Sequence, residues 1–393
     1  TYDPNAWERG LTVQQASDLF SEKKSVPALN RALQGLFAPA STFKAVSVVA
    51  AAAAGYDLNA VYKCPSEVQV GTRAFQNFDS KNQGSMNMKK ALAVSCDTIW
   101  YQIAFDEWLR DGGLRPKAEP NDYFFKAAQS FKITQKVGID LPTESTSRLA
   151  DRTYKKSWYA QNKDFYCNYK ERATKAQQTP FLLQLAAENC VDGDKVRAGD
   201  AVNFSIGQGD TVITPLKQAQ MYAAIANGGK IWRPSVAKAI VSTDGKVLKK
   251  IGSKQLGTLP ATQSTLNFLH GALREVVTGG TAAGAFSVFP IAISGKTGTA
   301  QVFGKNANGT LKADTSWFAS YGPTQNPRYA VVMMVSQAGF GASVSGVGVR
   351  KIYETLFGVT GSKVDPAKAI FPDGRPPQKI PKISPATKVK GAK

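Results

Sequence analysis

Three short motifs place hydroxyl, amine and carboxylate groups at spacings that suit acyl transfer through a serine nucleophile. Ser41 and Lys44 are three residues apart at the start of an Ala- and Val-rich run, so on a helix they share one face. A lysine serves as base to such a serine only if burial or a neighbouring cation lowers its pKa. The same spacing occurs at Ser21–Lys24 and Ser235–Lys238. The alternative for Ser41 is a helix N-cap beside an exposed lysine.

A second motif, Ser95-Cys96-Asp97, falls between two runs with helical periodicity. A hydroxyl there can relay a proton between Lys44 and a leaving amine, and the carboxylate can bind a lysine or a substrate amide. Two similar triplets, Ser80–Asn82 and Ser85–Asn87, lie in a polar stretch that is typical of a loop. The alternative role for Ser95 and Asp97 is to cap the following helix, Thr98–Leu109.

The third motif, Lys-Thr-Gly-Thr, lies in a β-branched run that predicts a strand. Lys296 would supply positive charge beside the nucleophile, and the hydroxyls of Thr297 and Thr299 would bind a substrate carboxylate. Gly298 would leave room for a substrate backbone. The backbone N–H groups of Ser41 and Thr299 would form an oxyanion hole, worth about 3–4 kcal/mol per donor.

The elements that must position these motifs form two blocks, a helical block near 41–210 and a mixed block near 213–358. Periodicity and capping signals predict helices at Ser41–Ala54, Met88–Leu109 with a break at the second motif, Thr214–Ala226, Thr262–Thr278 and Val347–Phe357. Strands are predicted at 291–303, 314–322 and 329–337, and a hairpin at 230–250. The polar stretch 140–178 is predicted to be a long surface excursion. The expected fold class is α/β (α+β), with helices on a sheet and an inserted helical subdomain.

The chain carries 49 Lys and Arg against 29 Asp and Glu, a net charge of +20. Nucleic acid is one partner that such a charge attracts. No zinc-finger spacing, aromatic RNA-binding motif or basic helix block accompanies it, so a membrane or a cell-wall polymer fits equally well. No signal peptide or apolar run of about 18 residues is present.

The cysteines are few and none forms a C-x-x-C pair. Cys167 and Cys190 flank a polar stretch and are the favoured disulfide in an oxidising compartment. Four unpaired buried thiols, including Cys64 and Cys96, are the alternative. His270 is the single histidine, which excludes a His-rich metal site.

In this order and context, the three motifs resemble the transpeptidase domain of class B penicillin-binding proteins, in particular the elongation-type penicillin-binding protein 2 group. Further stretches share the resemblance, which covers about residues 1–358: Ser95–Ala104, Phe204–Ala219, Ile225–Gly229, Asp314–Phe318 and Tyr321. It implies the penicillin-binding transpeptidase fold, related to serine β-lactamases. The fold has an antiparallel sheet with flanking helices, a helical subdomain at about 42–212 and an α/β subdomain at about 213–358. A Pro- and Lys-rich tail would occupy 359–393.

The resemblance implies a peptidoglycan D,D-transpeptidase that β-lactams acylate. Ser41 would attack the penultimate D-Ala carbonyl of a stem peptide, with Lys44 as base and Ser95 and Lys296 as proton relay. Its partners would be stem peptides and a glycosyltransferase of the elongation machinery, not nucleic acid. It would work at the outer face of the cytoplasmic membrane. A pedestal domain, the membrane anchor and the opening strands of the sheet are expected to lie before residue 1.

Two departures from the family pattern bear on the site. Ala40 stands where members often carry Gly. Some members hold zinc through a His near the second motif; His270 is remote in sequence, so we expect neither a metal nor a cofactor.

Other function classes remain open at this stage. A D,D-carboxypeptidase or a β-lactamase on the same scaffold would need a positioned water and base for deacylation. A non-catalytic β-lactam sensor would acylate without cross-linking. A basic nucleic-acid binder would do neither.

Overall fold

A three-stranded antiparallel sheet carries the Lys-Thr-Gly-Thr motif on its edge strand. In the computed structural model, which describes residues 3–24, 26–306 and 308–371, the strand order is β11-β10-β9. The strands are β9 (Ser294–Ala300), β10 (Thr315–Gly322) and β11 (Tyr329–Val335). In the β9–β10 register, Gly298 lies opposite Trp317 and Lys296 opposite Ala319. The predicted strands are confirmed, each within a few residues.

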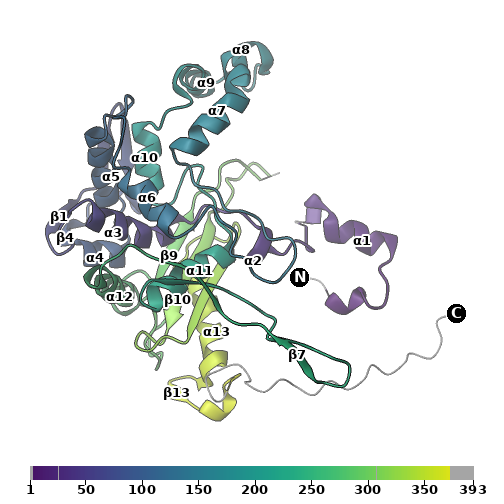
Figure 1. Cartoon of the computed structure of the whole chain (residues 1–393). Coiled ribbons are helices and arrows are strands. Elements are labelled where there is room, and N and C mark those ends of the chain that lie inside the picture. The colour runs from purple at the N-terminus through teal and green to yellow at the C-terminus, as the bar shows by residue number, and fades with distance from the viewer. Residues whose placement is uncertain (1–2, 25, 307, 372–393) are drawn as a thin grey trace.

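Helices cover both faces of this sheet (Figure 1). Helix α11 (Pro215–Ala226) packs on β10 and β11, α13 (Val347–Phe357) packs on β11, and α12 (Gln263–Thr278) runs along β9. The side chains of Thr214 and Thr262 cap the first turns of α11 and α12. Phe318 packs in the cluster of α12 and α13, whereas Ala319 and Tyr321 join the larger core. The alternation along β10 therefore gives each face of the sheet its own core.

The first half of the chain is mainly helical and packs against α12 through α3 and α4. Its helices are α3 (Lys44–Ala53), α4 (Met88–Val94), α5 (Thr98–Arg110), α6 (Tyr123–Ser130), α7 (Arg152–Cys167), α8 (Tyr169–Arg172), α9 (Pro180–Asp192) and α10 (Ala198–Ser205). Its short strands are β1 (Val61–Cys64), β2 (Glu67–Val70), β3 (Arg73–Gln76) and β4 (Gly84–Asn87). The break predicted within Met88–Leu109 is confirmed at Ser95, whose φ of 63° ends α4.

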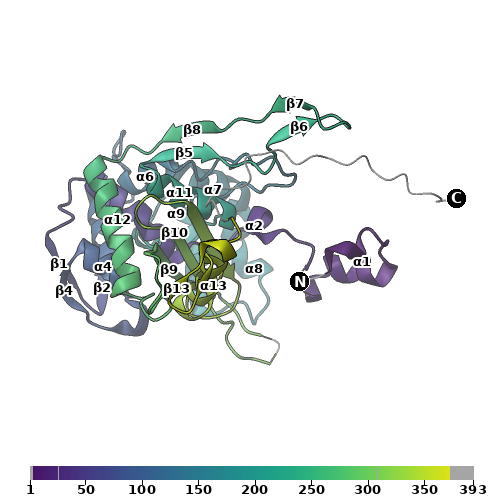
Figure 2. The same cartoon turned by 90° about the horizontal axis from the view of Figure 1, so that it is seen from below.

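Two predicted segments are present with more structure than the sequence indicated. The stretch 140–178 is a surface excursion, but much of it is helical, because α7 and α8 occupy it and form an outlying tier with α9 (Figure 1). The hairpin predicted at 230–250 is present, but its arm extends to Thr258, because Lys230–Arg233 pairs with Lys254–Thr258 (Figure 2). The strands of the arm are β5 (Lys230–Arg233), β6 (Ala239–Val241), β7 (Val247–Lys250) and β8 (Lys254–Thr258).

The remaining short elements lie near the two ends of the chain. They are α1 (Val13–Phe20), α2 (Arg31–Gln34), β12 (Val359–Thr360) and β13 (Lys363–Val364). Of the predicted tail, residues 372–393 lie outside the described part. No helix within the described residues has the length and apolar content needed to cross a bilayer. The expectation about segments before residue 1 stays a prediction.

Both pairs of cysteines form disulfides. Cys167–Cys190 joins the end of α7 to α9, as favoured from the sequence, and Cys64–Cys96 joins β1 to the second motif. The alternative of four unpaired thiols is therefore wrong.

Candidate active site

The Ser95 hydroxyl lies between two fully buried lysines. Its Oγ is 3.2 Å from Lys44 Nζ and 2.9 Å from Lys296 Nζ. Lys44 also donates to Ser95 O at 2.9 Å and to Asp97 Oδ1 at 2.6 Å. The structure thus joins residues from α3, the α4–α5 turn and β9 into one hydrogen-bonded network.

The two lysines have different electrostatic surroundings. Burial lowers the pKa of Lys44, and the Asp97 carboxylate opposes that shift. Burial lowers the pKa of Lys296 well below its usual range, and the nearby Lys44 cation adds to the effect. Lys44 has a carboxylate partner at hydrogen-bonding distance, so its charged form is stabilised more directly than that of Lys296. That Lys296 supplies positive charge beside the nucleophile stays a prediction.

Ser41 lies in a 3-10 turn, Ala40–Phe43, that leads directly into α3. The helix proper begins at Lys44, three residues later than predicted. Among the described residues, the Ser41 hydroxyl has no hydrogen-bond partner, while its side chain lines the cleft. Ala40 adopts a positive φ of 50°, a conformation that costs an L-residue about 1–2 kcal/mol and suits glycine better. Ala40, which stands where the family pattern often has Gly, is therefore a strained residue next to the nucleophile.

Asp97 does not cap α5, contrary to the alternative derived from its position. It occupies the N-cap position without a side-chain capping bond. Its Oδ1 binds Lys44, and its Oδ2 accepts the backbone N–H of Phe78 at 3.2 Å. The carboxylate is thus committed to the site rather than to the helix.

The outward face of β9 forms one wall of the site. Thr297 and Thr299 line the cleft, and the hydroxyl of Thr297 lies 2.6 Å from that of Thr281, in the segment after α12. Thr299 is held at its carbonyl by Gln208 Nε2 at 3.4 Å. These hydroxyls can bind an anion beside Lys296. The oxyanion hole itself stays a prediction.

Gly298 lies against the turn that carries Ser41. A methyl group there would lie 3.0 Å from Thr42 Cγ2 and 3.1 Å from Pro39 O, so the missing side chain lets this turn approach the strand. The glycine brings the nucleophile close to β9. That Gly298 also leaves room for a substrate backbone stays a prediction.

The cleft has a volume of about 700 Å³. Besides Ser41, Ser95, Asp97 and the two threonines of β9, it is lined by Asn77, Phe78, Thr281 and Phe340. Phe78 and Phe340 stack across it with their ring centroids 5.8 Å apart. These four residues were missed from the sequence because they belong to loops with no motif of their own.

The other sequence candidates lie outside the network. Lys24 pairs with Asp18, and Ser235 donates to Ala237 O as well as to Asp140. Asn87 caps α4. His270 Nδ1 lies 2.6 Å from Tyr321 OH, and among the described residues it makes no hydrogen bond with the three motifs. In the described part of the chain, no cluster of three or more His, Cys, Asp and Glu residues could hold a metal ion.

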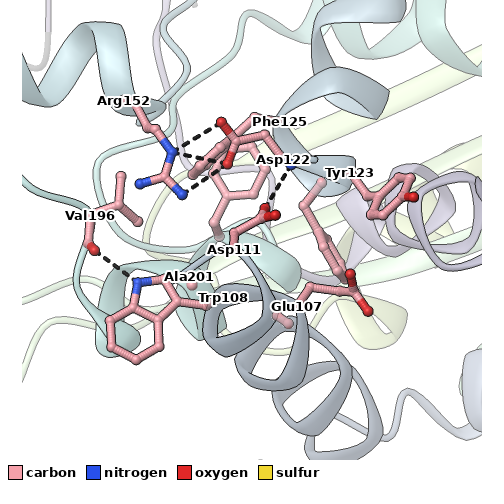
Figure 3. Close-up of a pocket in the computed structure, with 12 residues that line it drawn as sticks. Glu107, Trp108, Asp111, Asp122, Tyr123, Phe125, Arg152, Val196 and Ala201 are labelled. Carbon is pink, nitrogen blue, oxygen red and sulfur yellow. Dashed lines mark hydrogen bonds and ion pairs between the residues drawn. The ribbon is translucent and has the colours of Figure 1, made fainter. Parts of the chain in front are cut away.

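A second cavity, in the helical half, is structural (Figure 3). Its volume is about 30 Å³, enough for little more than water. The Arg152 guanidinium pairs with Asp122 at 2.9 Å, and Asp111 accepts the backbone N–H groups of Asn121 and Asp122. Because Arg152 and Asp122 pair with each other and Asp111 is bonded to backbone amides, the cavity is a poor site for a substrate.

Comparisons with known proteins identify the family of the chain. A family model described as the penicillin binding protein transpeptidase domain matches residues 1–354. Peptidoglycan D,D-transpeptidase MrdA of Escherichia coli K12 is 25% identical over 382 residues, which cover 91% of this chain and 51% of the relative. PbpA of Mycolicibacterium smegmatis is 26% identical over 361 residues, covering 88% and 60%. The chain spans about half the length of the curated relatives it matches.

Solved structures show the same fold. The crystal structure of Pseudomonas aeruginosa PBP2 in complex with WCK 5153 has a TM-score of 0.70 and 24% identity, covering 94% of this chain and 72% of that one. A chain from a peptidoglycan synthase complex that coordinates polymerization and crosslinking has a TM-score of 0.67 and 26% identity, covering 90% and 52%.

Proposed function

Because the chain belongs to the penicillin-binding protein transpeptidase domain family, we propose that it is a serine D,D-transpeptidase that cross-links peptidoglycan stem peptides. The observation that carries this proposal is the Ser95 hydroxyl, held between two buried lysines in the cleft that contains Ser41. Such a bridge can move a proton between the lysines without admitting water.

Acylation begins when the terminal carboxylate of the donor peptide binds beside Lys296, Thr297 and Thr299. The anion favours the charged form of Lys296, so a proton passes from Lys44 through the Ser95 hydroxyl to Lys296. Neutral Lys44 then accepts the Ser41 proton while Ser41 Oγ bonds to the penultimate D-Ala carbonyl carbon. The C–N bond breaks, and the relay returns a proton to the departing D-Ala amine.

The second half-reaction reverses these roles. The amine of a neighbouring stem peptide attacks the ester carbonyl carbon and loses a proton to the relay, a new C–N bond forms, the ester C–O bond to Ser41 Oγ breaks, and Ser41 regains its proton. A β-lactam would acylate Ser41 in the same way, but its ring nitrogen stays attached and blocks the incoming amine. No metal or cofactor enters either step.

The setting of this reaction is part of the proposal. A glycosyltransferase of the elongation machinery is the proposed partner, at the outer face of the cytoplasmic membrane. In support, one similar chain comes from a complex that coordinates polymerization and crosslinking, and another from a complex of Helicobacter pylori PBP2 with MreC. The net charge of +20 suits an anionic envelope surface.

The fate of the acyl-enzyme tests the proposal. The protein would be incubated with a donor stem pentapeptide and a labelled D-amino acid, and the exchanged and hydrolysed peptides would be quantified. Exchange exceeding hydrolysis supports the transpeptidase. Hydrolysis alone, or rapid turnover of a labelled penicillin, would identify a carboxypeptidase or a β-lactamase. A stable penicillin adduct without either peptide product would identify a sensor.

A further inference from the structure

Asn77, the residue after β3, carries a buried amide whose oxygen and nitrogen bind different parts of the chain. The residue is 3% exposed. Oδ1 accepts the backbone N–H groups of Asp97 at 2.8 Å and Thr98 at 3.2 Å. Nδ2 donates to Pro65 O at 2.6 Å and Lys81 O at 3.0 Å. These four bonds satisfy the amide and leave it one orientation.

Asn77 supplies the hydrogen-bond acceptor that the Asp97 side chain does not provide at the start of α5. The first amides of a helix need acceptors, which an N-cap aspartate ordinarily provides. Here Asn77 accepts from two amides at the start of α5, so the Asp97 carboxylate is free to pair with Lys44. The next residue, Phe78, donates its N–H to Asp97 Oδ2. Two consecutive residues of one segment therefore fix both the backbone and the side chain of Asp97.

A disulfide reinforces the contact between Asn77 and the second motif. Cys96, the middle residue of the second motif, is bonded to Cys64 at the end of β1, and both are fully buried. Pro65 follows Cys64, and its carbonyl oxygen accepts from Asn77 and, at 3.0 Å, from the hydroxyl of Thr98. The Ser95–Asp97 turn is thus also held by contacts that do not involve the lysines.

We propose that Asn77 is a positioning residue for acyl transfer, which orients Asp97 and through it sets the position and protonation of Lys44. The inference rests on the proposed function only through the acylation of Ser41. Among the described residues, the charged or titratable groups that interact with Lys44 are Asp97 on the α4–α5 turn and Lys296 on β9, and Tyr101 on α5 interacts with Asp97. Burial raises the pKa of Tyr101, with Asp97 adding to the effect, so this side chain stays neutral.

The test compares Asn77→Ala with Asn82→Ala. Asn82 is an exposed asparagine of the same segment, whose side chain accepts only the N–H of Gly84 among the described bonds. Acylation by a fluorescent penicillin would be followed over a range of concentrations and pH, which separates non-covalent affinity from the acylation rate. We expect Asn77→Ala to lower the rate constant about tenfold to a hundredfold, as expected for displaced catalytic groups. Its affinity should change little, and Asn82→Ala should behave as the wild type.

Asn77→Asp gives a second readout that loss of structure would not produce. It keeps an oxygen for the amides of Asp97 and Thr98 but adds a negative charge beside the site, which raises the pKa of Lys44. If neutral Lys44 is the base, the acylation rate increases as pH rises through the pKa of Lys44. In Asn77→Asp this increase should move to higher pH.

Three results would overturn the inference. One is a folded Asn77→Ala protein with the wild-type rate and pH profile. Another is that the acylation rate falls in both Asn77→Ala and Asn82→Ala, in each case in proportion to the fall in melting temperature. The third, decisive if Asn77→Ala does not fold, is an unchanged pH profile in Asn77→Asp. Absence of acylation in the wild type would instead refute the proposed function, and this role with it.

Discussion

Lys44 and Asp97 form an ion pair, with 2.6 Å between Nζ and Oδ1 and side chains that are 0% and 10% exposed. Lys296 lies on the other side of Ser95 and has no carboxylate partner among the described residues. The charged form of Lys44 therefore has a partner that Lys296 lacks. Under the proposed function, a substrate carboxylate would be the partner of Lys296, which would link substrate binding to proton transfer.

Asp97→Asn should move the pH dependence of acylation toward lower pH. The Asp97 charge raises the pKa of Lys44 against the opposing effect of burial. Removing it lowers that pKa further, so neutral Lys44 is present at lower pH and the alkaline rise of the rate begins earlier. The maximal rate should also fall, because Lys44 loses an orienting partner. Acylation rates measured across pH check this, and a shift toward higher pH would contradict the assignment of Lys44 as base.

Gly298→Ala should slow acylation by about tenfold or more, because displacing a reacting group by a fraction of an ångström is costly. The added methyl would press on Thr42 and Pro39, which flank Ser41. Gly252→Ala is the matched control, since a methyl there meets nothing within 4 Å. An unchanged rate in a folded Gly298→Ala protein would show that the turn and the strand do not need this close approach.

The two disulfides should contribute similarly to stability and differently to activity. Their sequence separations are 32 and 23 residues, for which the chain-entropy model gives about 3–4 kcal/mol each. Replacing Cys64 and Cys96 with alanine should lower both the melting temperature and the acylation rate. Replacing Cys167 and Cys190 should lower only the melting temperature. Equal effects on acylation would contradict a specific tie between Cys64–Cys96 and the second motif.

Thr281→Val should weaken binding of the donor more than it slows acylation. The hydroxyl of Thr281 bonds to that of Thr297, which we place at the substrate carboxylate. Loss of one such bond is worth about 0.5–1.5 kcal/mol, so the non-covalent dissociation constant should rise about two- to twelvefold. Thr281→Ser keeps the hydroxyl and should restore affinity; failure of that rescue would point to packing instead.

Local sequence signals predicted much of the fold and the core of the site. The capped helices α11 and α12, the helix α13 and the three strands of the sheet have strong periodicity or end signals, and the fold brings residues of all three predicted motifs together at one cleft. Helix α7 was missed because Lys155 is its only buried residue among those described. A helix without an apolar stripe resembles a polar loop in sequence.

Long-range contacts account for the rest of what was missed. Asn77 is an ordinary loop residue until the fold brings it to Asp97, and no spacing rule pairs Cys64 with Cys96. The reason for Gly298 also lies elsewhere in the chain, in the turn that carries Ser41. The charge on Lys296 depends on the arrangement of two lysines and one carboxylate, which the motifs alone do not define.

Mapping the penicillin adduct is the most direct test of the central claim that Ser41 is the nucleophile. Wild type, Ser41→Ala and Ser95→Ala would be treated with a fluorescent penicillin, and the labelled peptide would be identified by mass spectrometry. We predict an adduct on Ser41 in the wild type, none in Ser41→Ala, and a slower adduct on Ser41 in Ser95→Ala, where only the relay is lost. Labelling that persists in Ser41→Ala at the wild-type rate, or an adduct on Ser95, would contradict the account.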